Sequence, residues 1–187
     1  MKSPAVIFDI DKTLLIEDLP SFLYKKRIIK SSIIASGLPF SFLFFICFHI
    51  TRWRVRRLFE YWYENIIDNH RIVQAITTNR LFNEKVQKRL EKYLRLGYAV
   101  YLVTAAPNSI SRELETLFNV KVIGSDTFNG LIVNDLMGKK EYKVYRKISE
   151  DYEIVAIYSD SIGDHSSLAR YNYLVENQDI FLCLAPR

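Results

Sequence analysis

The sequence contains little of the residue types that organise disulfide-linked or flexible proteins. Among its 187 residues there are two cysteines, six glycines and five prolines. Cys47 and Cys183 lack the spacing of metal ligands and provide no disulfide framework, which fits a reducing compartment. The scarcity of glycine and proline argues against long flexible linkers, and no internal repeat is present. The length and an apolar content of 49% predict one domain, or one domain with a modest insertion.

The net charge of the chain leaves several classes of binding partner open. The net charge of +5 arises from 26 basic and 21 acidic residues, and basic residues cluster at 25–30 and 52–57. Such an excess suits nucleic acid, an anionic membrane surface or a phosphorylated substrate. The first apolar run, at 5–10, is too short and too soon interrupted by Asp9 for a signal peptide, so a cytoplasmic location is expected.

Strand patterns alternate with helix patterns along most of the chain. Short apolar runs predict buried strands at 5–10, 98–103, 120–123, 154–158 and 173–175. Helices are predicted at 83–96, 108–118 (capped by Asn108), 141–148 and 164–170, and a hairpin at 127–132 with Asn129-Gly130 as its turn. This alternation predicts an α/β fold with a doubly wound parallel sheet, in which the functional site lies at the carboxyl ends of the strands.

Polar side chains follow the predicted strands at those ends. They are Asp9 and Asp11, then Thr104, then Asp160 and Asp164. Paired carboxylates can bind a hard cation or divide the roles of nucleophile and acid/base. Taken singly, each has another interpretation: an Asp-x-Asp segment also caps turns or binds calcium, a threonine at a strand end is often structural, and Asp164 fits a helix N-cap.

The order of these elements resembles the haloacid dehalogenase-like phosphohydrolases over nearly the whole chain. The resemblance rests on Asp9 to Leu14, on Thr104 at a strand end, on a following lysine, and on Ser-Asp-Ser with a second aspartate at Asp160 and Asp164. It implies a Rossmann-like core, a Mg²⁺ cofactor and a phosphoaspartyl intermediate. The chain is therefore expected to be an enzyme, a phosphomonoester hydrolase.

The resemblance also implies a role for each matched residue. Asp9 would attack phosphorus and ligate magnesium. Asp11 would protonate the leaving oxygen, then activate water, and lend its backbone carbonyl to the metal. Asp160 would be a further ligand, and Asp164 would hold it or a metal-bound water. Thr104 and a lysine would neutralise charge on the transferring phosphoryl group.

The identity of that lysine stays open in the sequence. Lys139, Lys140 and Lys143 are the candidates; Lys140 fits the loop position best, whereas Lys143 suits the nearest relatives. The sequence departs from the pattern of its relatives at His165, where they often begin a helix rich in proline and leucine. His165 is expected on a helix surface rather than as a catalytic base.

The resemblance divides the chain into a catalytic core, 1–16 and 81–187, and a helical cap, 17–80, inserted after the first strand. Size and placement resemble the branch of phosphoserine phosphatases and bacterial phosphatidylglycerophosphatases. Residues 31–51 contain no charged side chain and reach the length of about 20 residues that a membrane span needs. A single span would separate Asp9 from the other site residues, so a hairpin broken at 37–39 is the better interpretation, dipping into one leaflet or packing internally.

These observations lead to one favoured function and two alternatives. The favoured function is a magnesium-dependent phosphatase for a lipid or amphiphilic phosphate, cytoplasmic, with the cap as a peripheral or monotopic contact on the inner face of the membrane through 28–57. A soluble phosphatase for a small metabolite, such as phosphoserine or a sugar phosphate, is the alternative. A catalytically idle adaptor disagrees with the intact aspartates. No nucleic-acid module surrounds the aromatic and arginine residues at 53–63, so nucleic acid is not expected.

Overall fold

A seven-stranded sheet forms the centre of the protein. The computed structural model describes residues 2–19, 22–23, 26, 71–128 and 131–183. The strands are arranged in the order β4-β3-β2-β1-β5-β6-β7. Their bounds are Ser3–Asp9 (β1), Ala99–Pro107 (β2), Lys121–Phe128 (β3), Leu131–Asn134 (β4), Tyr152–Ser159 (β5), Tyr171–Glu176 (β6) and Asp179–Cys183 (β7). The five inner strands run parallel, and β4 and β7 pair antiparallel at the two edges.

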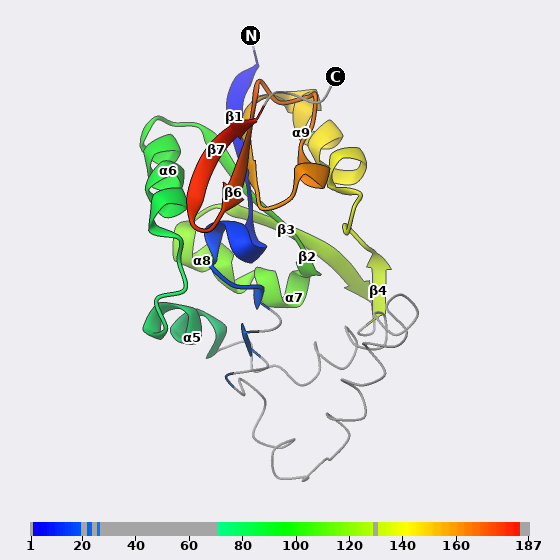
Figure 1. Cartoon of the computed structure of the whole chain (residues 1–187). Coiled ribbons are helices and arrows are strands. Elements are labelled where there is room, and N and C mark those ends of the chain that lie inside the picture. The colour runs from blue at the N-terminus through cyan, green and yellow to red at the C-terminus, as the bar shows by residue number, and fades with distance from the viewer. Residues whose placement is uncertain (1, 20–21, 24–25, 27–70, 129–130, 184–187) are drawn as a thin grey trace.

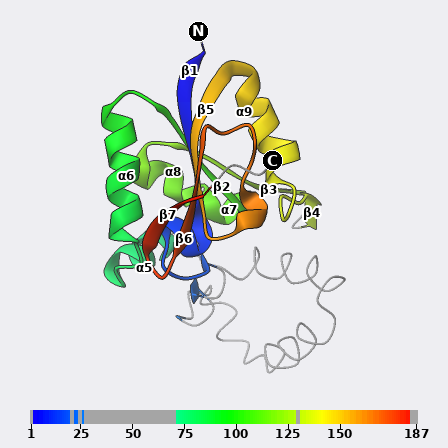
Figure 2. The same cartoon turned by 45° about the horizontal axis from the view of Figure 1, so that its top comes forward.

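Helices cover both faces of this sheet (Figures 1 and 2). On one side lie α5 (Ile72–Thr78), α6 (Glu84–Arg95) and α8 (Glu113–Phe118), the last following the short α7 (Asn108–Ser111). On the other side, a helical segment η3 (Glu141–Tyr145) continues into α9 (Arg146–Asp151). The predicted α/β class with a doubly wound, largely parallel sheet is confirmed.

The sheet is buried on both faces because apolar residues alternate between two clusters. Val6 and Phe8 of β1 pack in the cluster beneath α6 and α8, whereas Ala5 and Ile7 pack in the cluster beneath η3 and α9. All four side chains are fully buried. This placement at the centre explains why the sequence of β1 is continuously apolar instead of alternating.

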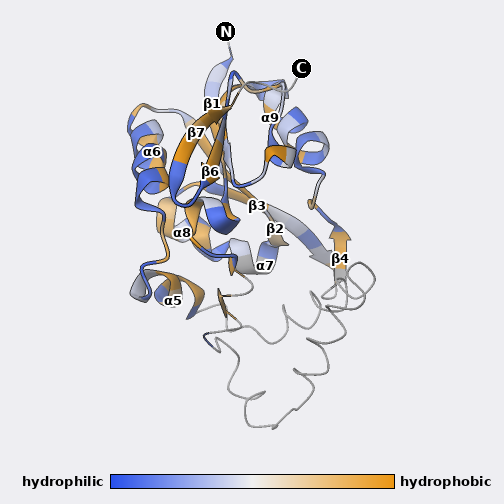
Figure 3. Ribbon diagram, viewed as in Figure 1, coloured by the Kyte–Doolittle hydropathy of each residue, from blue (hydrophilic) through white to orange (hydrophobic). Residues whose placement is uncertain are grey.

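Helix α6 begins and ends as its sequence predicts. The side chain of Asn83 accepts hydrogen bonds from the backbone N–H groups of Lys85 and Val86. Gly97 follows the helix in a left-handed conformation, with φ of 75°. Figure 3 shows hydrophilic and hydrophobic residues side by side along α6, as expected of a helix with one buried face.

Some residues of the predicted cap range pack with the sheet. Leu19, Phe22 and Leu23, and Ile72, Ala75 and Ile76 of α5, belong to the cluster that also contains Val6 and Phe8. The apolar run 31–51 and its proposed hairpin lie outside the described residues, as do both basic clusters apart from Lys26. Within the described part of the chain, no helix combines the length and the hydrophobicity that crossing a bilayer requires.

Three local predictions differ from the structure. The predicted helix 164–170 is wrong: η4 (Ile162–Asp164) is a single 3-10 turn, and extended and turn residues follow it. Asn108 does not cap a helix, because its side chain accepts from Gly124 N and donates to Asp126. The last strand, β7, was not predicted at all.

Candidate active site

The two aspartates of the first motif lie where β1 ends. Asp9 is the last residue of the strand, and Asp11 lies in the turn Ile10–Leu14 that follows. Lys12 adopts a left-handed conformation there, with φ of 54°, which turns the chain sharply after Asp11. The neighbouring strands bring Thr104 of β2 and, beyond β5, Asp164 of η4 to the same edge of the sheet.

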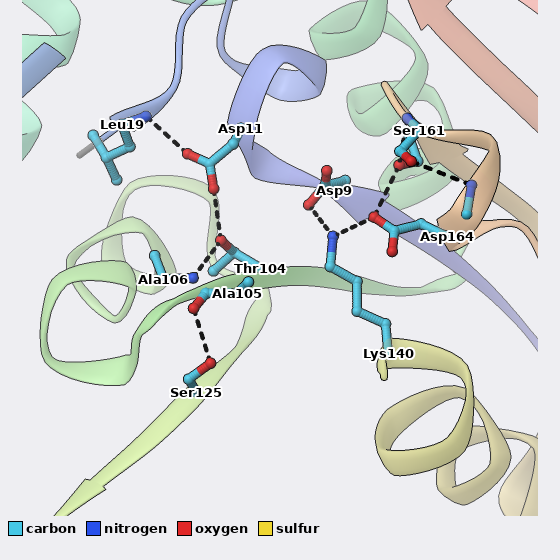
Figure 4. A network of polar contacts seen from close by, with 12 residues as sticks. Asp9, Asp11, Leu19, Thr104, Ala105, Ala106, Ser125, Lys140, Ser161 and Asp164 are labelled. Carbon is cyan, nitrogen blue, oxygen red and sulfur yellow. Dashed lines mark hydrogen bonds and ion pairs between the residues drawn. The ribbon is translucent and has the colours of Figure 1, made fainter. Parts of the chain in front are cut away.

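One ammonium group joins two of the carboxylates. Lys140 Nζ donates to Asp9 Oδ1 and to Asp164 Oδ2, both at 2.7 Å (Figure 4). Lys140 and Asp9 are each about 5% exposed, so this bridge is shielded from water. Ser159 Oγ, at the end of β5, also donates to Asp164 Oδ2, at 3.3 Å. Residues 131 positions apart thus form a buried ionic centre.

Asp11 is held by neutral donors instead. Thr104 Oγ1 donates to Asp11 Oδ2 at 2.9 Å, and Leu19 N donates to Asp11 Oδ1 at 2.8 Å. The Thr104 hydroxyl in turn accepts a hydrogen bond from Ala106 N at 3.0 Å. Thr104 was predicted to bind phosphate; in this structure its hydroxyl, which has a single proton to donate, bonds to Asp11, as the dashed line in Figure 4 marks.

The other predicted site residues are placed differently. Lys143 Nζ contacts Asn134 Oδ1 and Asp135 O rather than a carboxylate of the site. Asp160 directly follows β5 and is partly exposed. His165, predicted on a helix surface, is instead 6% exposed and lies outside any helix, with its Nε2 atom buried without a hydrogen-bond partner among the described residues.

Burial raises the pKa of both motif aspartates, and different partners oppose the rise at each. Burial raises the pKa of Asp9 to about 8; the charge of Lys140 opposes this rise, while Asp11 and Asp164 add to it. Burial also raises the pKa of Asp11, as does the charge of Asp18, and the hydrogen bonds from Leu19 and Thr104 partly offset the change. Burial alone would lower the pKa of Lys140, but Asp9 and Asp164 raise it above its usual value. Lys140 therefore stays charged, and both aspartates have a raised affinity for a proton.

The chemistry of the donors suits a hard cation. Asp9, Asp11 and Asp164 bring three carboxylates to a buried region that contains one lysine, and oxygen is the ligand that Mg²⁺ prefers. The raised pKa of Asp9 shows that its ionised form needs more positive charge nearby. As the side chains stand, no three His, Cys, Asp or Glu residues among those described are grouped as metal ligands.

A cleft of about 570 Å³ opens beside the ionic centre. It is lined by residues of the 138–146 segment, among them Lys139, Lys140, Lys143 and Arg146, and by Gly163 before Asp164. Glu141 is its one acidic residue. The basic lining would attract an anionic ligand towards this side of the site.

The comparisons with known proteins agree with this geometry. A family model described as haloacid dehalogenase-like hydrolase matches residues 6–169. No curated protein matches the chain.

Solved structures share the fold at low identity. A protein of unknown function from Bordetella pertussis Tohama I superposes with a TM-score of 0.61 at 14% identity, covering 88% of this chain and 85% of its own. A phosphoserine phosphatase, solved as an analogue of its phospho-aspartyl intermediate, gives 0.51 at 13% identity, covering 88% and 81%. Cytosolic 5′-nucleotidase IIIB bound to cytidine gives 0.53 at 14% identity, covering 87% and 67%. At such identities these likenesses show the fold alone.

Sequence reasoning missed the groups that position the site residues. Leu19 N and Ser159 Oγ each contact a site carboxylate; Leu19 lies eight positions from its partner Asp11 and carries no sequence signal, and Ser159 is marked only by its place next to Asp160. The contact between Thr104 and Asp11 joins residues 93 positions apart. Only their shared place at the ends of adjacent strands could have indicated it.

Proposed function

Because the chain belongs to the haloacid dehalogenase-like hydrolase family, we propose that it is a phosphatase that cleaves phosphomonoesters through a phosphoaspartyl intermediate on Asp9. The match over residues 6–169 confirms the predicted family and, with it, a hydrolytic enzyme. A catalytically idle adaptor would not need the aspartates that the structure brings together.

The bridge from Lys140 to Asp9 and Asp164 is the observation that supports this function best. In the proposed reaction, a carboxylate oxygen of Asp9 attacks phosphorus, forming an O–P bond as the ester P–O bond breaks. The ammonium group that contacts Asp9 at 2.7 Å would then contact the transferring phosphoryl oxygens. Lys140 is thus the proposed phosphate-binding lysine in preference to Lys143, whose ammonium group contacts Asn134 and Asp135.

Asp11 is the proposed general acid and base. Its raised pKa favours the protonated form that can donate a proton to the leaving oxygen. In the second half-reaction its carboxylate accepts a proton from water, and the resulting hydroxide cleaves the acyl phosphate and restores Asp9. Thr104 and Leu19 would hold the carboxyl group in place between these two steps.

Magnesium is the proposed cofactor, as it is general for the family. Asp9, Asp160 and the Asp11 carbonyl would hold it, with Asp164 supporting them. When bound, it supplies the positive charge that shields the phosphoryl group and the buried carboxylates.

For the substrate, we propose a small soluble phosphomonoester ahead of a lipid phosphate. The named structural relatives include a phosphoserine phosphatase and a 5′-nucleotidase, which favours the small-metabolite alternative. The case for an amphiphilic substrate rests on 28–57, which lie outside the described residues. Contact of that segment with the inner face of a membrane stays a prediction, as do the cytoplasmic location and the division into core and cap.

A phosphate-release assay with Mg²⁺ tests the proposal. Soluble phosphomonoesters are compared with phospholipid phosphates in micelles, and beryllium fluoride is used to trap the phosphorylated state. We expect soluble esters to be cleaved faster and Asp9→Asn to lower kcat by about 10⁴-fold or more, because it removes the attacking charge. Asp179→Asn, which changes an exposed carboxylate on β7, is the matched control. Full activity of Asp9→Asn would refute the nucleophile, and a preference for micelles would restore the lipid substrate.

A further inference from the structure

Two segments that carry site residues, Thr104 in one and Lys140 in the other, meet on β3. Thr104 lies in an irregularity of β2, since Val103 pairs with Ile123 but Pro107 pairs with Ser125. Two extra residues therefore bulge out of the sheet directly after Val103. Lys140 follows the turn that begins at Leu136, where Lys139 N donates to Leu136 O at 3.0 Å. Neither segment is fixed by regular strand pairing, so other contacts must set their separation.

A single buried hydroxyl group connects the two segments. Ser125 Oγ donates to Ala105 O at 2.8 Å, and it accepts from Leu136 N at 3.1 Å. Figure 4 shows the first of these bonds directly below Thr104. Ser125 is fully buried, so loss of its hydroxyl would leave a carbonyl and an amide without partners in the interior.

The next residue of β3 forms a second connection on the exposed side. Asp126 accepts from Asn108 Nδ2 at 2.7 Å, just beyond the Thr104 bulge, and from Asn134 Nδ2 at 3.0 Å, just before the Lys140 turn. Successive strand residues point to opposite faces, so the two connections lie on different sides of β3. Asp126 is exposed, and water competes for its bonds. The buried connection through Ser125 is therefore the stronger.

Gly124 brings the bulge close to β3. A Cβ atom at this position would lie 2.6 Å from Ala106 O and 2.7 Å from Ser111 Oγ. Only glycine permits this approach, and its N–H donates to Asn108 Oδ1 at 2.6 Å. Three consecutive residues of β3 thus lie against the bulge or contact Asn108 just beyond it, and two of them also contact the segment leading to Lys140.

We propose that Ser125, assisted by Asp126, is a positioning residue that fixes the Thr104 bulge relative to the Lys140 turn and so sets the geometry in which the site holds a phosphoryl group. This inference rests on the proposed function for the identity of the ligand. It assigns no chemistry to Ser125, which acts only through Ala105 and Leu136.

Ser111 provides a matched control within the same chain. It is also fully buried, and its hydroxyl donates to Pro107 O at 3.2 Å and to Asn108 O at 3.5 Å. Those acceptors belong to the start of its own helix, so Ser111 does not join the two segments. Ser111→Ala and Ser125→Ala remove the same group from equally buried sites, and only the second removes the connection.

The experiment measures the binding of inorganic phosphate in the presence of Mg²⁺ by titration calorimetry, alongside thermal unfolding and turnover of a soluble phosphomonoester. We expect Ser125→Ala to raise the phosphate dissociation constant by about tenfold or more, since a small misplacement of binding groups has large effects. Ser111→Ala should change it by less than about threefold, and Asp126→Ala should fall between them. The Leu136 amide should exchange its hydrogen faster only in Ser125→Ala.

The outcomes separate this inference from the proposed function. Equal losses of phosphate affinity in Ser125→Ala and Ser111→Ala would overturn the positioning role. If Ser125→Ala does not fold, Ser125→Cys has a similar size but is a weaker donor and acceptor, so it should still raise the phosphate dissociation constant more than Ser111→Cys does. Equal effects of the two cysteine variants would also overturn the positioning role. A wild-type chain that binds phosphate but cleaves no ester would refute the phosphatase, and the affinities of the variants would still decide the role of Ser125.

Discussion

The two halves of the candidate site hold their carboxylates in different ways. Asp9 and Asp164 share one buried ammonium group, whereas Asp11 is held by a hydroxyl and a backbone amide. An ammonium group stabilises the ionised carboxylate, which a nucleophile needs. Burial raises the pKa of both aspartates; the charge of Lys140 is the main opposing influence at Asp9, and hydrogen bonds from Leu19 and Thr104 are the main ones at Asp11. The contrast teaches that the environment of each aspartate, and not its residue type, assigns its role.

Among the tests of this comparison, replacing Lys140 should lower activity most, because it removes the ammonium group that Asp9 and Asp164 share. Lys140→Met retains a long side chain but leaves Asp9 and Asp164 without their shared cation. We expect kcat/KM for a soluble phosphomonoester to fall by about 10²- to 10³-fold, the usual loss when a group that stabilises developing charge is removed. Steady-state kinetics of purified variants provides the measurement.

The neighbouring lysines serve as matched controls. Lys139 is exposed and Lys143 contacts Asn134 and Asp135, so Lys139→Met and Lys143→Met should each lower kcat/KM by less than about tenfold. If Lys143→Met were as damaging as Lys140→Met, the assignment of the phosphate-binding lysine to Lys140 would be wrong.

The sequence predicted the sheet well because its signals are local. The inner strands are short apolar runs; Asp9 ends β1, Thr104 lies in the last part of β2, and Asp164 lies five residues after β5. In a parallel sheet, position at a strand end is enough to predict proximity. What the sequence could not predict is the partner of each group, because the bonds from Lys140 to Asp9 and from Thr104 to Asp11 join distant parts of the chain.

The incorrect helix at 164–170 has a physical cause in its side chains. Ser166 N donates to Asn172 Oδ1, Asn172 Nδ2 donates to Ser166 O, and Leu168 N donates to Ser166 Oγ. These side chains offer the backbone an alternative to helical hydrogen bonds. Asn172 is on β6, outside the window that the helical pattern covers, so the competition was not visible in the sequence.

The missed strand β7 lacks the usual turn signal. Its hairpin with β6 turns at Asn177 and Gln178, with φ of 50° and 65°. Two consecutive positive φ angles normally favour glycine at the second position, as in Asn-Gly. Glutamine there conceals the turn, whereas the Asn129-Gly130 pair predicted a hairpin that the antiparallel pairing of β3 and β4 supports.

Removing the Thr104 hydroxyl tests the half of the site that holds Asp11, and it should lower activity by an intermediate amount. Thr104→Val keeps the shape of the side chain and removes the bond to Asp11 Oδ2. We expect kcat to fall by about 10- to 100-fold with a smaller change in KM, because the hydroxyl orients the general acid. The measurement is a full substrate saturation curve. Thr77→Val, on the exposed side of α5, is the control, because it makes the same substitution where the hydroxyl donates only to Val73 O of its own helix. A rise in KM that exceeds the fall in kcat would show that the hydroxyl binds phosphate directly, as the sequence suggested.

The smallest expected effect concerns the turn that separates Asp9 from Thr13. Lys12 is exposed and has φ of 54° and ψ of 6°, a left-handed conformation that costs a residue with a Cβ atom about 1 kcal/mol. Lys12→Gly relieves this strain but gives the unfolded chain more freedom, so we expect a net gain of at most about 1 kcal/mol in the free energy of unfolding. For a chain of this size that corresponds to a rise in Tm of about 2 to 4 °C, measurable by thermal unfolding. Lys12→Ala removes the same charge and keeps the Cβ atom, so it should bring no such gain. If both variants were stabilised equally, the benefit would come from lost charge repulsion, and the turn that follows Asp11 would be unstrained.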